Sequence, residues 1–165
     1  SIPKFFANDE AFGVYTPLSA NVDYATQKVE EFEAKEVVAG LYGEYKISED
    51  KKVDATVYTK FFSDIDGTYK IGVYVMENGI VNYQNGIGQD HVHDHLVRSA
   101  VSGILGTSLP KTQFATNEVI KTDYDKVVSD VVDVNNTYVV AILFKSLGAT
   151  SLEIVNSRAL ELFEE

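Results

Sequence analysis

The sequence contains no cysteine. Thiol catalysis, disulfides, thiolate zinc sites and lipid attachment through cysteine are therefore excluded for this chain. Basic residues are also scarce, since 14 lysines and arginines stand against 25 acidic residues and give a formal net charge of −11. Nucleic acids and anionic membranes are bound through basic surfaces, so neither is predicted as a partner.

Long apolar runs are absent as well. The longest strongly apolar segment, 138–144, is far below the roughly 20 residues that a membrane-spanning helix needs, so no membrane span is expected. The first four residues do not resemble a signal peptide. With 165 residues, of which 45% are apolar and 24% charged, the composition is typical of one globular domain.

The hydrophobic pattern divides the chain into two parts. Residues 1–21 show no clear period and are predicted to form an irregular N-terminal segment, followed by a helix and a β-sandwich over residues 22–165. Val22, Ala25, Val29 and Phe32 recur at spacings of three and four, which places them on one face of a helix over 22–35. This face is expected to lie against the sandwich.

After residue 36 the apolar period changes to two, which predicts strands over 37–47, 53–61 and 69–75. Asp-Gly at 66–67 and Asn-Gly at 78–79 are typical of hairpin turns. Further strands are expected at 118–122, 127–134, 138–145 and 152–161, while the glycine-containing stretch 84–117 is expected to be mainly loop. The predicted fold is mostly β, an immunoglobulin-like antiparallel β-sandwich with a short N-terminal helix.

All three histidines fall in one short segment, between Asp90 and His95. On a strand, His91, His93 and His95 share one face and are candidate ligands of zinc or another first-row metal, with Asp90 and Asp94 as further ligands or as hydrogen-bond partners of the histidines. A structural role is the favoured interpretation, in which the imidazoles bond backbone carbonyls and Arg98 and hold an irregular segment. A pH-sensitive or ligand contact is the third possibility.

No catalytic motif is complete. The Gly-x-Ser-x-Gly elbow and the Walker loop are missing, and Gly86-Ile87-Gly88 lacks the third glycine of a dinucleotide-binding fingerprint. We therefore predict no catalytic residues and no cofactor. Ten tyrosines and nine phenylalanines are numerous enough for a carbohydrate-binding surface, but their alternating positions favour packing between strands.

Several segments resemble a known family. They are VYVMENGI at 73–80, HDHLVRSA at 93–100, the glycines at 103 and 106, VNNTYVVAILF at 134–144 and EIVNSRA at 153–159. Together they resemble the C-terminal immunoglobulin-like domain of the outer-membrane-protein-28-related family of Bacteroidetes, over roughly residues 22–162.

The resemblance implies a protein of the outer membrane, the cell surface or the periplasm, often a lipoprotein, with a thioredoxin-like domain upstream in relatives. This chain has no room for a thioredoxin domain and no Cys-x-x-Cys motif, so the redox chemistry of relatives is not carried over. A lipid anchor, if the natural protein has one, is expected upstream of Ser1. The family supplies no catalytic residues to transfer.

Arginine occurs only at Arg98 and Arg158, and both lie in the matching segments. Because the planar guanidinium holds carboxylates in a defined geometry, we expect Arg98 to pair with Glu77, with His93 or His95 beside it. This contact would hold the segment 93–98 next to the strand at 73–77. Glu77, His93, His95, Arg98 and Arg158 are the predicted structural motif.

The sequence therefore predicts a non-catalytic interaction or structural module of an outer-membrane-associated or cell-surface protein. Its expected partner is a protein or a glycan at the cell surface. Two alternatives remain open, a metal-dependent binding or hydrolytic protein built on His91, His93 and His95, and a carbohydrate-binding module.

Overall fold

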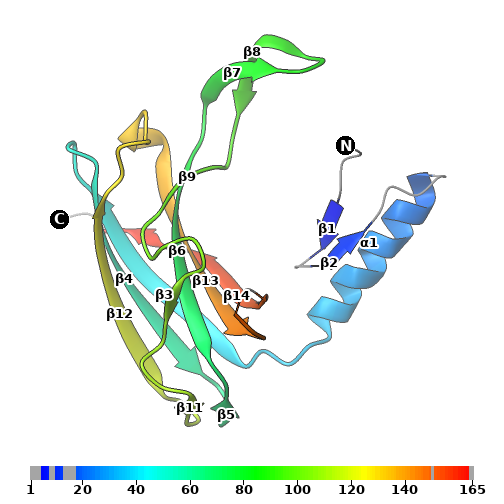
Figure 1. Ribbon diagram of the computed structural model, residues 1–165, viewed down its shortest axis with the longest axis vertical. Helices are drawn as coiled ribbons and strands as arrows, with labels where there is room; N and C mark the ends of the chain where they lie inside the picture. Colours follow the sequence, from blue (N-terminus) through cyan, green and yellow to red (C-terminus); the bar gives the residue numbers. More distant parts are fainter. Residues whose placement is uncertain (1–4, 8–9, 13–17, 150, 164–165) are drawn as a thin grey trace.

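Two sheets face each other in the computed structural model, which describes residues 5–7, 10–12, 18–149 and 151–163 (Figure 1). The first sheet has the order β12-β4-β3-β15, formed by Val119–Val127, Lys52–Phe61, Ala39–Ile47 and Glu161–Leu162. The second contains β6 (Tyr69–Glu77), β13 (Thr137–Ser146) and β14 (Leu152–Ala159), with β9 (Leu96–Ala100) and β10 (Thr107–Ser108) both on the outer edge of β6. Apart from the parallel β15, all pairs are antiparallel among the described strands. The predicted mostly-β sandwich with one short helix is confirmed.

Strict alternation along the long strands builds the core. Every second residue of β4 is buried, from Val53 to Phe61, and in β3 the same alternation runs from Ala39 to Tyr45. The facing side chains of the second sheet are equally buried and include Tyr69, Ile71, Val73, Val75, Val139, Ala141 and Leu143. Because side chains of a strand point to opposite faces in turn, a period of two is enough to place these residues between the sheets.

The helix α1 (Leu18–Glu33) does not lie against the sandwich as predicted. It begins four residues earlier than expected, contacts β1, and extends away from the sheets (Figure 1). Val22 and Val29 of its apolar face are exposed. The inner faces of the two sheets already cover each other, so the helix is not needed to complete that core. The small hairpin of β1 (Phe5–Ala7) and β2 (Glu10–Phe12) falls in the segment predicted to be irregular.

Asn78-Gly79 does not turn the chain, contrary to the prediction. Beyond β6 the chain runs on into β7 (Ile80–Gln84), which pairs with β8 (Gly88–His93), and the reversal lies between these two strands. The stretch predicted to be loop therefore contains β8, β9, β10 and the short β11 (Gln113–Phe114). Phe114 is the one buried residue in these four strands, and the others are exposed or half-buried, so the strands lack the alternation of buried apolar residues by which a strand is recognised.

Two other turn predictions also change. The Asp-Gly turn at 66–67 carries the chain from one sheet to the other instead of closing a hairpin, and β5 (Ile65–Asp66) pairs with β11. The strand expected over 127–134 is absent, because β12 ends at Val127 and a loop leads to the short 3₁₀ helix η1 (Val134–Asn136). Val128 and Val131 are buried in that loop, and their apolar character accounts for the mistaken strand prediction.

Candidate functional site

Glu77 is a fully buried carboxylate at the end of β6. Its Oε1 accepts hydrogen bonds from the backbone N–H groups of Val132, at 2.9 Å, and Asp133, at 2.5 Å. A buried charge is tolerated only when it is paired and hydrogen-bonded, and this one has both kinds of partner. The carboxylate therefore ties the loop 128–133 to the second sheet.

Arg98 supplies the opposite charge from the neighbouring strand β9. Its Nε lies 3.0 Å from Glu77 Oε2, which is the pair expected from the sequence. The same guanidinium donates to the backbone carbonyl of Asp130, through Nε at 2.9 Å and through Nη2. We call Glu77, Arg98 and the backbone of 130–133 the Glu77–Arg98 cluster. It joins β6, β9 and the loop at one end of the sandwich.

A kink follows directly beyond this cluster. The β6–β9 ladder ends at Glu77 and Leu96, and the β7–β8 ladder begins at Ile80 and His93. Between them, Asn78 Oδ1 accepts from the N–H of His95, and Asp94 Oδ1 accepts from the N–H of Gly79, both at 2.8 Å.

Gly79 and His95 both adopt a left-handed backbone, with φ of 74° and 59°. Glycine reaches this region without steric cost, and histidine is among the residues that tolerate it. The reciprocal bonds hold the β7–β8 hairpin at a defined angle to the sandwich, above which it projects (Figure 1).

The three histidines do not converge. His95 turns toward β13, where its Nδ1 lies 2.7 Å from the hydroxyl of Tyr138. His91 and His93 share one face of β8, with ring centroids 4.7 Å apart. In the part of the chain that the structure describes, no three histidine, aspartate or glutamate side chains are placed to hold a metal ion. The structure therefore brings together two of the three expected ligands. The guanidinium of Arg98 contacts Glu77 and the carbonyl of Asp130, not the expected His93 or His95.

The remaining predicted residues lie outside the Glu77–Arg98 cluster. Asp94 is used in the kink, and Asp90 is exposed on β8. Arg158 is exposed on β14, where its Nη2 lies 3.3 Å from Glu161. Exposed ion pairs of this kind contribute little to stability, so Arg158 does not share the role of Arg98.

Exposed apolar side chains on the β7–β8 hairpin were missed by the sequence analysis. The exposed fraction is 60% for Val81, 56% for Tyr83, 63% for Ile87 and 51% for Val92. Val81 lies directly opposite Val92, so these two share a face, while Asn82 and His91 lie on the other. One signal in the sequence points to this surface: apart from histidines, Asp90 is the sole charged residue between Ile80 and His93.

The kink offers a first prediction. Asn78→Ala and Asp94→Ala each remove one of the reciprocal bonds, and each is expected to cost about 1 kcal/mol locally. Amide exchange in residues 80–93 should then accelerate, while exchange in β13 stays unchanged. Gln89→Ala, at an exposed position of β8, is the control. Equal exchange in all three variants would show that the reciprocal bonds do not hold the hairpin.

Comparisons with known proteins agree with this architecture. A family model described as outer membrane protein Omp28 matches residues 19–162. HBP35 of Porphyromonas gingivalis superposes with a TM-score of 0.68 at 19% sequence identity, over 93% of this chain and 48% of HBP35. The chain thus spans about half the length of that protein. No curated protein matches the chain.

Two other solved structures are more distant. The sporulation control protein Spo0M from Bacillus subtilis has a TM-score of 0.45 at 9% identity, over 78% of this chain and 50% of Spo0M. The C-terminal domain of Wzt has a TM-score of 0.47 at 10% identity, over 79% of this chain and 76% of that domain.

Within the described residues, no helix has the length and apolar character needed to cross a membrane. Since the family model covers most of the sequence, the chain belongs to the outer membrane protein Omp28 family, a family of outer-membrane-associated or cell-surface proteins.

Proposed function

We propose that this domain is a non-catalytic interaction module that binds a protein partner at the cell surface through its β7–β8 hairpin. The observation that carries the proposal is the group of four exposed apolar side chains, Val81, Tyr83, Ile87 and Val92, on an element that projects from the sandwich. Exposed apolar side chains that are concentrated on one element in this way are typical of protein interaction sites.

The charge pattern supports the same surface. The chain as a whole carries a formal charge of −11, whereas the hairpin holds a single acidic residue, Asp90. The core of a protein interface is depleted in charged residues and enriched in aromatic ones, and Tyr83 supplies such an aromatic ring. In the described chain β7 and β8 pair only with each other, so their outer backbone edges are open to a further strand.

The way in which the hairpin is attached to the sandwich also supports a binding role. The Glu77–Arg98 cluster and the kink give the hairpin a defined direction before any partner arrives. Such preorganisation lowers the entropy that is lost on binding. The polar groups of the cluster and the kink form hydrogen bonds and an ion pair with one another, which favours a structural role for them over a catalytic one.

Fewer observations favour the two alternative functions, a metal site and a carbohydrate site. A metal site would rest on His91 and His93 alone, with rings 4.7 Å apart. For a carbohydrate site, the exposed ring of Tyr42 stacks on Tyr58 of the adjacent strand, at 6.0 Å between centroids. That geometry is cross-strand packing. The family resemblance further leads us to propose a lipid anchor and, as in relatives, an upstream thioredoxin-like domain.

Site-specific photo-crosslinking in cells tests the interaction. A crosslinking amino acid replaces Val92 on the hairpin or, as the matched control, Val119 on β12, since both side chains are 51% exposed. We expect a discrete protein adduct from position 92 and none from position 119. Tyr83→Ser should reduce the yield of that adduct about tenfold, because aromatic side chains often dominate binding energy. Equal crosslinking from both positions, or an adduct indifferent to Tyr83→Ser, would contradict the proposal.

A further inference from the structure

We propose that a second site, at the opposite end of the sandwich, binds a small carboxylic acid with an apolar body. A pocket of about 360 Å³ lies there between the C-terminal end of α1, the segment that leads to β3, and β6, β13 and β14 of the second sheet. We call it the junction pocket, and its walls include Phe32, Val38, Tyr69, Lys145, Glu153 and Val155. Its volume is in the range of small-molecule sites. The proposal is independent of the β7–β8 hairpin, which projects from the other end (Figure 1).

Tyr69 provides an unused polar group in this pocket. The side chain is buried, and its ring packs edge-on against Phe61 and Phe114, at 5.5 and 5.6 Å between centroids. Its hydroxyl has no hydrogen-bond partner among the described residues. A buried hydroxyl without a partner is costly, and a ligand oxygen in the pocket would supply one. Burial, and then the charge of Glu153, raise the pKa of Tyr69, so the hydroxyl stays protonated and is able to donate.

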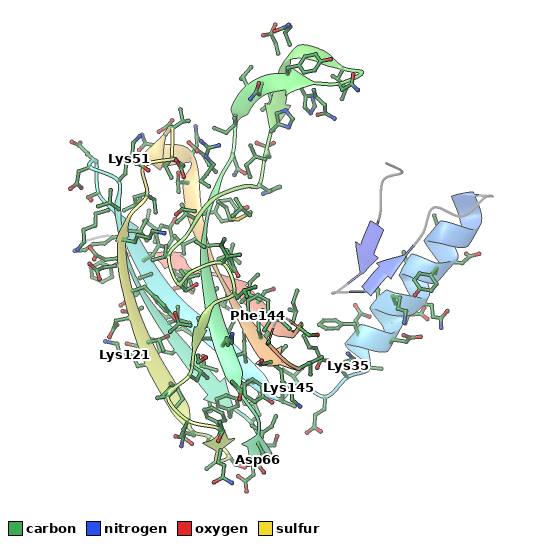
Figure 2. All side chains as sticks on the ribbon, in the orientation of Figure 1. Lys35, Lys51, Asp66, Lys121, Phe144 and Lys145 are labelled. Atoms are coloured by element: carbon green, nitrogen blue, oxygen red, sulfur yellow. The ribbon has the colours of Figure 1, made fainter. Side chains whose placement is uncertain are left out.

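One charged group of the pocket, the ammonium of Lys145, favours an anion. Tyr69, Lys145 and Glu153 lie side by side across β6, β13 and β14. Glu153 is paired with Lys35, whose Nζ lies 3.3 Å from its carboxylate. Lys145 has no ion pair within the described residues and is only partly exposed. Figure 2 shows Lys35 and Lys145 reaching the same end of the molecule from the helix side and from the sheet. An ammonium group without an ion pair among the described residues, on the strand position paired with Tyr69, matches a carboxylate.

The remaining walls are suited to a hydrocarbon. They include Phe32 at the end of α1, Val38, and Ile154 and Val155 of β14. Burying an apolar chain against them is favourable because it removes apolar surface from water. Glu36 also lines the pocket, but its side chain is exposed. The ligand class is therefore amphipathic, with one anionic head and an apolar body.

Titration with octanoate, followed by amide chemical shifts in the whole chain, tests this inference. Shifts are expected at the lining residues of the junction pocket and not in the β7–β8 hairpin. Octanamide, which lacks the charge, should bind about tenfold more weakly, and Lys145→Gln should weaken octanoate binding to a similar degree. Tyr69→Phe removes only the hydroxyl, so it should weaken octanoate while leaving the melting temperature unchanged or raised.

Lys60→Gln is the matched control, since Lys60 is exposed on β4 away from the pocket. It should leave octanoate binding unchanged. The inference is overturned if octanoate shifts no pocket residue at concentrations up to about 10 mM, the range of weak binding. It is equally overturned if octanamide binds as tightly as octanoate, or if the Lys145→Gln protein binds octanoate as tightly as the unaltered protein does. Neither result would affect the crosslinking test of the hairpin.

Discussion

Replacing Arg98 with methionine is expected to lower the free energy of unfolding by about 3–5 kcal/mol, because it leaves the buried carboxylate of Glu77 without its charged partner. The backbone bonds from Val132 and Asp133 remain, but they do not neutralise the charge. The carbonyl of Asp130 also loses its donor. For a chain of this size the melting temperature should fall on the order of 10 °C, measured by thermal unfolding with urea denaturation as a second measurement.

Arg158→Met is the matched control for this prediction. Arg158 is the only other arginine, its side chain is 51% exposed, and it also pairs with a glutamate. Its loss should cost at most about 1 kcal/mol. Arg98→Lys should fall between the two, because an ammonium keeps the charge and loses the planar geometry. A loss of a degree or less for Arg98→Lys, together with equal losses for the two methionine variants, would show that Arg98 is an ordinary surface charge.

Phe61→Ala is expected to destabilise the protein by about 3–5 kcal/mol through the cavity that it leaves between the sheets. Phe61 is fully buried at the end of β4, and its ring stacks on Phe114 with 4.2 Å between centroids. The same ring contacts Tyr69, so the substitution also loosens the aromatic cluster that joins the two sheets. Urea denaturation should show a lower midpoint.

Phe62→Ala provides a control one residue away. Phe62 lies on the opposite face of the chain and is 45% exposed, so its removal should cost about 1 kcal/mol or less. Losses of similar size at the two positions would contradict the assignment of inner and outer faces. Both variants should keep the β-sheet circular-dichroism spectrum of the unaltered protein. The difference between them is then one of stability and not of fold.

The core could be predicted from the sequence because its signal is local. Val53, Val57 and Phe61 occupy one parity of a strand, and the pleat alone sends them to one side. The Glu77–Arg98 pair could be predicted for a different reason. Arginine occurs only twice in this chain, and its planar guanidinium is suited to holding a carboxylate. The backbone donors of Val132 and Asp133 could not be predicted, because almost any residue type supplies an N–H group and no side chain distinguishes these two positions.

The histidine segment shows where local reasoning ends. A strand through His91, His93 and His95 would place all three rings on one face, but the left-handed backbone at His95 rotates the third ring toward Tyr138. Asn78-Gly79 was predicted to be a hairpin turn, yet the two residues form a kink between two ladders. Whether such a pair reverses the chain depends on the strand that lies opposite.

The sequence by itself determined the strand periodicity, the faces of the long strands, the acidic character and the membership in a family. Each of these depends on neighbours in the chain or on composition. Only the tertiary structure decided the path of the β7–β8 hairpin, the contacts of the buried Glu77 carboxylate and the position of α1. Those features depend on which distant segment supplies a hydrogen bond or covers an apolar face, and that choice is made by the packing of the whole chain.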